Sequence, residues 1–180
     1  MRAVATLVLG GARSGKSAHA EGLLPAERAT YVATARADPT DPEWQARIAT
    51  HAARRPPGWR TIELATPHDL TRLLKEVPET AAPILVDDIA TWLATLLDDT
   101  DAWADGSLDP VRDECERLAA AVGACRAEVV LVSAEVGLGV VPATRAGRLF
   151  RDQLGSLNAA LAEQCAEVFL LVAGIPLRLR

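Results

Sequence analysis

The chain has few cysteines, and none of them is spaced for metal or redox chemistry. The three that occur among 180 residues are Cys115, Cys125 and Cys165, and no pair of them has the CxxC spacing of thiolate metal sites and redox motifs. A chain of this length buries roughly two thirds of its unfolded surface, so it needs no disulfide for stability. We therefore expect three reduced thiols that act as small apolar core residues.

The sequence also lacks an excess of positive charge and any long apolar run. Its 19 Lys and Arg residues and its 24 Asp and Glu residues give a net charge of −5 and a pI near 5.2. Binders of nucleic acid or anionic membranes need a basic surface, so we expect neither partner. No segment reaches the roughly 18 consecutive apolar residues of a membrane span, and residues 1–9 lack the pattern of a secretory signal. These absences predict a cytoplasmic protein.

What the chain does have is an ordinary globular composition, with 49% apolar and 24% charged residues. Short runs rich in β-branched residues alternate with longer helical stretches, a pattern typical of a parallel sheet with crossover helices. We expect strands at 3–9, 30–34, 84–87, 129–133 and 168–172, and a weaker one at 60–64. We expect helices at 16–24, 43–54, 67–74, 89–97, 110–125 and 143–165, the last with a glycine, Gly155, that could interrupt it. The prediction is one α/β domain over residues 1–180, with helices on both faces of its sheet.

The strongest motif follows the first predicted strand and opens the first predicted helix. It matches GxxxxGK[ST], and its residues are Gly10, Gly11, Ala12, Arg13, Ser14, Gly15, Lys16 and Ser17. Glycines let backbone N–H groups turn toward phosphate oxygens at the positive end of the helix. Lys16 would reach the β and γ phosphates, and the Ser17 hydroxyl would ligate Mg²⁺. A glycine-rich helix cap is the alternative, but the flanking strand and helix favour a P-loop NTPase-like (RecA-like) fold.

A second element for Mg²⁺ is predicted at the end of the strand 84–87. The apolar run Ile84-Leu85-Val86 ends in Asp87, followed by Asp88. Parallel α/β sheets bind ligands beyond the carboxyl ends of their strands, which would place Asp87 near the phosphate loop. A strand that merely ends in a polar turn has the same sequence pattern. Asp87 is a candidate Mg²⁺ ligand because the phosphate loop is expected beside it.

One histidine stands among arginines in the predicted helix 43–54. Arg47, His51 and Arg54 would share a helix face, with Arg55 beside them. These guanidinium groups would attract a polyphosphate and lower the histidine pKa, which favours a neutral, nucleophilic imidazole. The alternative is a surface histidine without chemical function. The residues alone leave both open.

The sequence resembles the adenosylcobinamide kinase/adenosylcobinamide-phosphate guanylyltransferase family of cobalamin biosynthesis. The resemblance spans nearly the whole chain, with matching segments that include GGARSGKSAHAE at 10–21, RIATHAARRPPGWRTIE at 47–63 and EVGLGVVP at 135–142. It implies two reactions. A nucleoside triphosphate, ATP or GTP, phosphorylates adenosylcobinamide, and GTP then donates GMP to adenosylcobinamide phosphate through a guanylylated histidine, here His51.

The resemblance also implies a set of binding residues and an assembly. Besides the phosphate loop, the nucleotide contacts carried over are Thr34, Ala35, Arg36, Ala52, Ala53, Arg54, Arg55, Glu63 and Asp87. Lys16 and His51 would be catalytic, Ser17 and Asp87 would hold Mg²⁺, and the chain would form a homo-oligomer, a trimer or a hexamer. The carboxyl-terminal strand, Trp92 and Trp103 are candidates for contacts between subunits.

The chain departs from the family pattern at three places, and two other functions remain open. The segment between Thr34 and His51 is about two residues longer than expected around 39–42, Asp88 stands where Cys is frequent, and Ala134 stands where Asn is frequent. A small-molecule P-loop kinase would act without a covalent step. A GTP-binding regulatory module would instead switch loops between nucleotide states.

Overall fold

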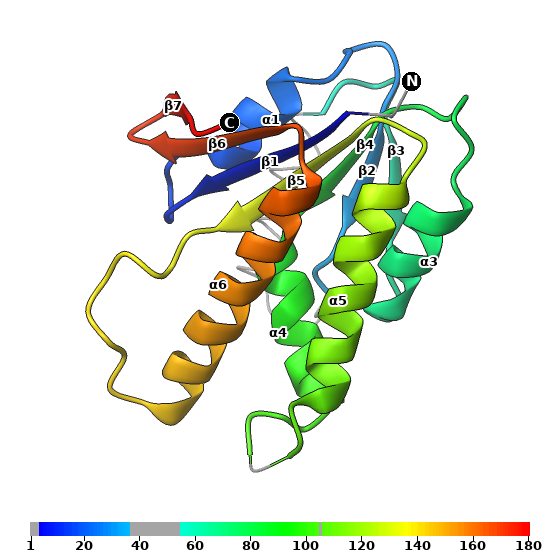
Figure 1. The fold of residues 1–180 in the computed structure, drawn as a ribbon. Coiled ribbons are helices and arrows are strands. Elements are labelled where there is room, and N and C mark those ends of the chain that lie inside the picture. Colours follow the sequence, from blue (N-terminus) through cyan, green and yellow to red (C-terminus); the bar gives the residue numbers. More distant parts are fainter. Residues whose placement is uncertain (1–3, 37–54, 105) are drawn as a thin grey trace.

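The computed structural model describes residues 4–36, 55–104 and 106–180, and is built around one seven-stranded sheet (Figure 1). The strands are β1 (Ala5–Gly10), β2 (Thr30–Ala33), β3 (Arg60–Glu63), β4 (Ile84–Asp87), β5 (Val129–Ala134), β6 (Glu167–Val172) and β7 (Ile175–Arg178). The helices are α1 (Lys16–Gly22), α3 (His68–Glu76), α4 (Ile89–Asp99), α5 (Asp109–Ala124) and α6 (Arg145–Gln164).

The sheet has the order β3-β2-β4-β5-β1-β6-β7 and is parallel except for β7, which pairs antiparallel with β6. Strand β5 lies between β1, which leads into the phosphate loop, and β4, which ends in Asp87. The mainly parallel α/β class and its P-loop, RecA-like arrangement are confirmed. All six parallel strands end at the same edge, so the loops that follow them meet there.

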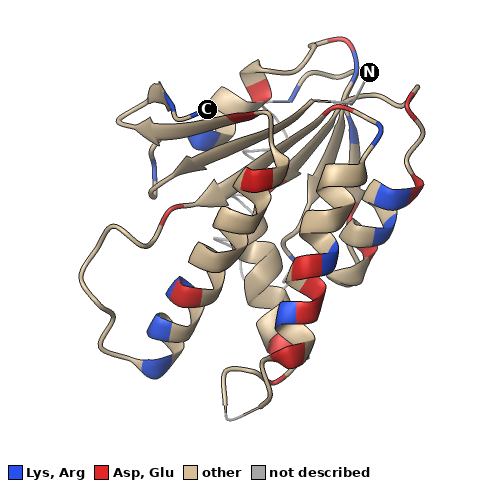
Figure 2. Cartoon of the chain, in the orientation of Figure 1, with Lys and Arg blue, Asp and Glu red and all other residues tan. Residues whose placement is uncertain are grey.

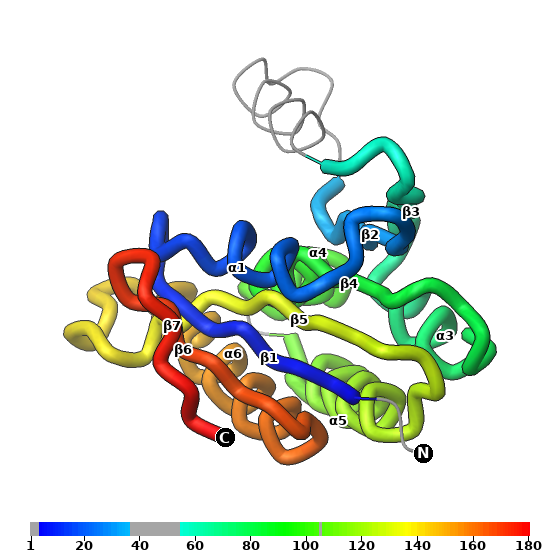
Figure 3. The backbone as a smooth tube through the Cα atoms, turned by 90° about the horizontal axis from the view of Figure 1, so that it is seen from above, coloured from blue at the N-terminus to red at the C-terminus, as the bar shows by residue number. Residues whose placement is uncertain are grey.

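Helices cover both faces of the sheet, as predicted, but unequally (Figure 3). Alternate residues of β1 show this, because Leu7 and Leu9 join the larger core with α3, α4, α5 and α6, whereas Val8 joins a smaller core with α1. Charged residues of both signs occur along α3, α5 and α6 (Figure 2). None of the helices in the described part of the chain is long and apolar enough to cross a membrane.

A buried carboxylate joins α3 to α5. The Glu114 side chain is 3% exposed and accepts a hydrogen bond from Thr71 Oγ1 at 2.6 Å. Its other oxygen contacts His68 Nδ1 at 2.8 Å and Arg117 Nε at 3.2 Å. Because a buried charge is costly without partners, this network explains how a glutamate is tolerated between two helices.

Several sequence predictions differ from the structure. Helix α6 runs unbroken through Gly155, and the antiparallel strand β7 was not predicted. Trp92 is fully buried and donates a hydrogen bond to Pro67 O, so it offers no surface to another subunit. The cysteines are free, and burial raises the pKa of Cys115 and Cys165 to about 12. Cys125 and Cys165 are buried as predicted, whereas Cys115 is only partly so.

Candidate nucleotide site

The phosphate loop connects β1 to α1 through two glycines that no other residue could replace without strain. Gly15 has φ +89°, in the left-handed region, and a Cβ on it would lie 3.3 Å from Gly174 Cα. A Cβ on Gly10 would lie 2.3 Å from Ser14 Oγ. The loop is therefore shaped by tight backbone approaches, and α1 begins immediately after it at Lys16.

Two polar side chains of the loop, those of Lys16 and Ser14, are suited to contact a bound phosphate. Lys16 Nζ donates to Gly11 O at 3.3 Å, so the ammonium group lies over the loop where phosphates would bind. Ser14 is only 7% exposed, and its Oγ has no hydrogen-bond partner among the described residues. The loop thus offers the Lys16 ammonium group and the Ser14 hydroxyl, and both can bind an anion such as a phosphate group.

Asp87 lies beside the start of α1, where the sequence pattern placed it. Its Oδ1 accepts a hydrogen bond from Ser17 Oγ at 3.3 Å. A hydroxyl and a carboxylate are oxygen ligands of the kind that Mg²⁺ takes, with phosphate oxygens and waters filling its other positions. The described residues contain no cluster of three or more His, Cys, Asp or Glu side chains that could hold a metal by themselves. This pair therefore suits an ion that the nucleotide helps to bind.

Tyr31 holds the other oxygen of the same carboxylate. Its hydroxyl donates to Asp87 Oδ2 at 3.0 Å, from the neighbouring strand β2. Burial, and then the negative charge of Asp87, raise the pKa of Tyr31 above its ordinary value, so the hydroxyl remains a donor. Tyr31 was not predicted from the sequence. The only available signal was a phenol in a strand expected beside the strand of Asp87.

Arg55 covers the face of the Tyr31 ring. Its guanidinium carbon lies 3.3 Å from the ring centroid, and Nη1 donates to Thr61 Oγ1 at 2.9 Å. Arg55 Nε is buried and has no hydrogen-bond partner among the described residues. The structure therefore brings one of the predicted arginines to the Tyr31–Asp87 pair.

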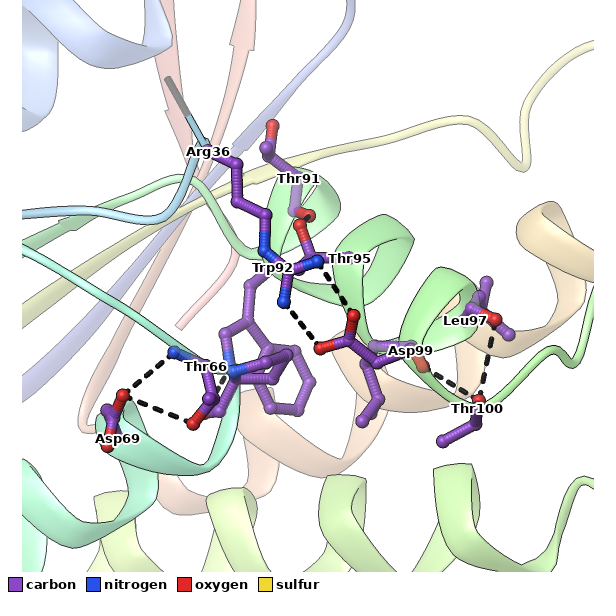
Figure 4. Close-up of polar contacts among 11 residues, drawn as sticks. Arg36, Thr66, Asp69, Thr91, Trp92, Thr95, Leu97, Asp99 and Thr100 are labelled. Carbon is purple, nitrogen blue, oxygen red and sulfur yellow. Dashed lines mark hydrogen bonds and ion pairs between the residues drawn. The ribbon is translucent and has the colours of Figure 1, made fainter. Parts of the chain in front are cut away.

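The residues after β2 lie at the same sheet edge and are tied to α4. Thr34 Oγ1 donates to Asp88 O at 2.8 Å and accepts from Asp88 N at 2.9 Å. The Asp88 side chain caps α4 by accepting from Thr91 N at 2.7 Å, which gives this departure from the family pattern a structural role. Arg36 makes a two-pronged ion pair with Asp99 at 2.6 and 2.7 Å (Figure 4).

Most of the predicted site residues meet at this edge, and the others lie outside the described residues. Asp87 is next to the phosphate loop, Thr34 to Arg36 follow β2, and Glu63 ends the adjacent β3 opposite Ala33. His51, Ala52, Ala53 and Arg54 belong to the segment that the structure does not describe. Gly174 is a further contact of the loop, and the sequence does not predict it because the contact depends on the turn between β6 and β7.

Comparison with known proteins gives matches over almost the full length. A family model described as cobinamide kinase/cobinamide phosphate guanyltransferase matches residues 6–179. The bifunctional adenosylcobalamin biosynthesis protein CobP of Pseudomonas aeruginosa is 42% identical over 178 residues, which cover 97% of this chain and 96% of the relative. The bifunctional adenosylcobalamin biosynthesis protein CobU of Salmonella typhimurium is 40% identical over 182 residues, covering 97% and 98%.

Among solved structures, the P4 protein of bacteriophage phi6 in complex with ADP aligns with a TM-score of 0.47 and 13% identity. The alignment covers 97% of this chain and 52% of that protein.

Proposed function

The chain belongs to the cobinamide kinase/cobinamide phosphate guanyltransferase family, and we propose how its residues carry out the two reactions of that family. It is an enzyme of adenosylcobalamin biosynthesis that acts as an adenosylcobinamide kinase and an adenosylcobinamide-phosphate guanylyltransferase. The observation that supports our assignment of residues is the contact of 3.3 Å between Ser17 and Asp87 at the phosphate loop.

In the first reaction, the phosphate loop holds a nucleoside triphosphate while the substrate hydroxyl attacks the γ-phosphorus. The bond from that phosphorus to the bridging oxygen breaks, the nucleoside diphosphate leaves, and the hydroxyl proton is released. Lys16 stabilises charge on the transferred group. Ser17 and Asp87 would hold Mg²⁺, which supplies further charge neutralisation when it is bound. Tyr31 fixes the orientation of the Asp87 carboxylate.

In the second reaction, His51 is the proposed nucleophile. Its neutral imidazole attacks the α-phosphorus of GTP, and pyrophosphate leaves as a phosphorus–nitrogen bond forms. A phosphate oxygen of adenosylcobinamide phosphate then attacks the same phosphorus, which releases the histidine and yields adenosylcobinamide-GDP. Arg55, which covers the ring of Tyr31, supports this assignment because it brings positive charge to the site from the neighbouring segment.

Radiolabelled GTP tests the covalent step. We expect the wild-type protein to form an acid-labile, base-stable adduct and to release pyrophosphate. His51→Ala should lose the adduct and guanylyl transfer yet retain phosphorylation of adenosylcobinamide. His68→Asn is the matched control and should keep both activities, because His68 lies on α3 outside the phosphate loop and Asn keeps a donor where Nδ1 contacts Glu114.

The same measurements distinguish the two other functions. A P-loop kinase without a covalent step would phosphorylate adenosylcobinamide and form no adduct. A regulatory GTP-binding module would hydrolyse GTP slowly and modify no corrinoid. Lys16→Ala should abolish phosphorylation with or without a covalent guanylyl step. That loss would show that the kinase activity depends on the phosphate loop.

The homo-oligomeric state is also a proposal. The resemblance implies a trimer or a hexamer, and β7 supports an assembly because it is an edge strand with Leu177 more than half exposed. Light scattering coupled to size exclusion measures the molar mass. A monomer at micromolar concentration would contradict the proposal.

A further inference from the structure

Two exposed apolar segments flank the phosphate loop, and neither has been assigned a part in binding the substrates. One is the loop after β5, with Val136, Leu138, Val140 and Val141, and the other is the β6–β7 turn, with Val172 and Ile175. We call these six residues the apolar rim. Leu138 and Val140 are 83% and 93% exposed, and Ile175 is 70% exposed. Apolar side chains gathered at this level of exposure mark an interaction site.

Both segments are bonded directly to the backbone of the phosphate loop. Glu135 N donates to Gly10 O at 3.1 Å, immediately before the first segment of the apolar rim. Gly174 N donates to Ser14 O at 2.9 Å, within the second segment. Both segments lie on the side of the molecule where α1 begins (Figures 1 and 3). The apolar rim therefore has a defined position next to the phosphate loop.

The first segment is anchored at both of its ends. At its start, Glu135 Oε1 accepts from Gly137 N at 2.6 Å. At its end, Arg148 donates to Pro142 O at 3.0 Å and to Ala143 O at 2.8 Å. No Lys, Arg, Asp or Glu occurs in residues 136–144, so the loop is uncharged (Figure 2). The residues that anchor its two ends, Glu135 and Arg148, are charged.

We propose that the apolar rim binds the apolar face of the corrinoid macrocycle during both reactions. This inference rests on the proposed function, which requires a hydroxyl on a side arm of a large macrocycle to reach a γ-phosphate bound at the phosphate loop. A substrate of that size has to lie on the surface that adjoins the phosphate loop. Contact with the apolar rim would orient the reacting hydroxyl and exclude water from it.

A second copy of the chain is the other occupant that such a surface could take. A stable interface uses about 20–30 residues on each side. The apolar rim alone supplies six residues, too few for such an interface, and its larger segment, the loop after β5, is separated by β1 and β6 from the β7 edge that we propose for assembly. Because the apolar rim adjoins the phosphate loop, where the reacting hydroxyl has to be placed, we assign it to the substrate.

Paired variants test this assignment. Leu138→Ser combined with Val140→Ser alters one segment, and Ile175→Ser alters the other. Leu179→Ser is the matched control, because Leu179 is also exposed, at 55%, and lies on the same face as Leu177. It follows β7 at the end distant from the β6–β7 turn. We expect the KM for adenosylcobinamide to rise at least about fivefold in both test variants, because apolar contact with the substrate is lost. The Kd for ATP and the molar mass should stay unchanged.

Direct binding of adenosylcobinamide separates this inference from the proposed function. Equilibrium dialysis, read by the visible absorbance of the corrinoid, needs no turnover. If the wild-type protein binds adenosylcobinamide but does not phosphorylate it, the proposed function fails. If the test variants bind and turn over adenosylcobinamide as the wild type does, or if their molar mass falls, the assignment of the apolar rim is overturned.

Discussion

At the residue scale, the feature that organises the site is a carboxylate held by two hydroxyl groups from different elements. Ser17 at the start of α1 contacts one oxygen of Asp87, and Tyr31 on β2 contacts the other. Tyr31 is a positioning residue, because it acts on the proposed metal site only through Asp87. Its ring is also packed under Arg55, so hydroxyl and ring can be tested separately.

Tyr31→Phe removes the hydroxyl and leaves the ring under Arg55. A lost hydrogen bond to a charged group corresponds to about 1.5 kcal/mol. The Mg²⁺ concentration for half-maximal phosphorylation should therefore rise about tenfold, while the rate at saturating Mg²⁺ changes little. Titrating the kinase activity with Mg²⁺ measures this. Thr71→Val, which deletes a buried hydroxyl bonded to Glu114, is the control, and an equal effect there would reduce Tyr31 to a structural role.

Tyr31 also predicts how stability depends on alkaline pH. Its pKa is raised in the folded chain, above the value of about 10 of an unfolded tyrosine. Below about pH 10 the residue is neutral in both states and contributes no pH dependence. At higher pH the unfolded chain loses the proton first, so the free energy of unfolding falls.

Urea unfolding at a series of alkaline pH values measures this loss, and Tyr31→Phe should show a smaller one. The chain has one tyrosine, so tyrosinate absorbance reports on it alone. An absorbance change in the folded protein at the ordinary pKa of tyrosine would contradict the prediction.

At the scale of elements, α6 shows how packing overrides a weak position. The helix runs over 20 residues through Gly155, although glycine lowers helix stability. Leu154, Leu157 and Leu161 are buried on one face of the helix, and this face holds it against the sheet. Apolar packing therefore maintains the helix across the glycine.

Gly155→Ala should consequently stabilise the protein. An added Cβ would meet no atom within 4 Å, so only the gain in helix propensity remains, about 0.5–1 kcal/mol. The midpoint of urea unfolding measures the change. Gly174→Ala is the contrasting variant and should destabilise the protein, because Gly174 has φ +79°. Destabilisation by Gly155→Ala would show that the helix is strained at that position.

At the scale of the whole molecule, the parallel sheet gathers the functional groups at one edge. Strands β1, β2, β3 and β4 deliver the phosphate loop, the residues after Thr34, Glu63 and Asp87 to that edge. The core beneath this edge is continuous through β1, β4 and β5, which are the most buried strands. Binding at the edge should therefore stabilise the entire fold.

We expect saturating GTP with Mg²⁺ to raise the free energy of unfolding by about 2.7 kcal/mol at a ligand concentration 100 times the Kd. Thermal unfolding with and without nucleotide measures this effect. Lys16→Ala should lose most of it, because the ammonium group that faces the phosphates is gone. A variant that is stabilised as strongly as the wild type would indicate that GTP binds elsewhere.

Particular elements show how far sequence reasoning reached. The bounds of β4 agree with the prediction, and those of β1 differ by only one or two residues, because buried parallel strands are short apolar runs with clear ends. Strand β7 was missed because it is an edge strand containing Pro176 whose pairing depends on a turn with positive φ at Ala173 and Gly174. Helix α5 begins at Asp109 with Leu108 as N-cap, one residue earlier than the start at 110 predicted from the sequence.

The sequence by itself determined the class of fold, the phosphate loop, the carboxylate at the end of β4 and the family, because each depends on residues close together in the chain. Only the tertiary structure decided that Tyr31 holds Asp87, that Gly174 packs against Gly15, and that two apolar segments flank the phosphate loop. These contacts join residues tens of positions apart. Their geometry follows from strand order and side-chain packing, which no local pattern encodes.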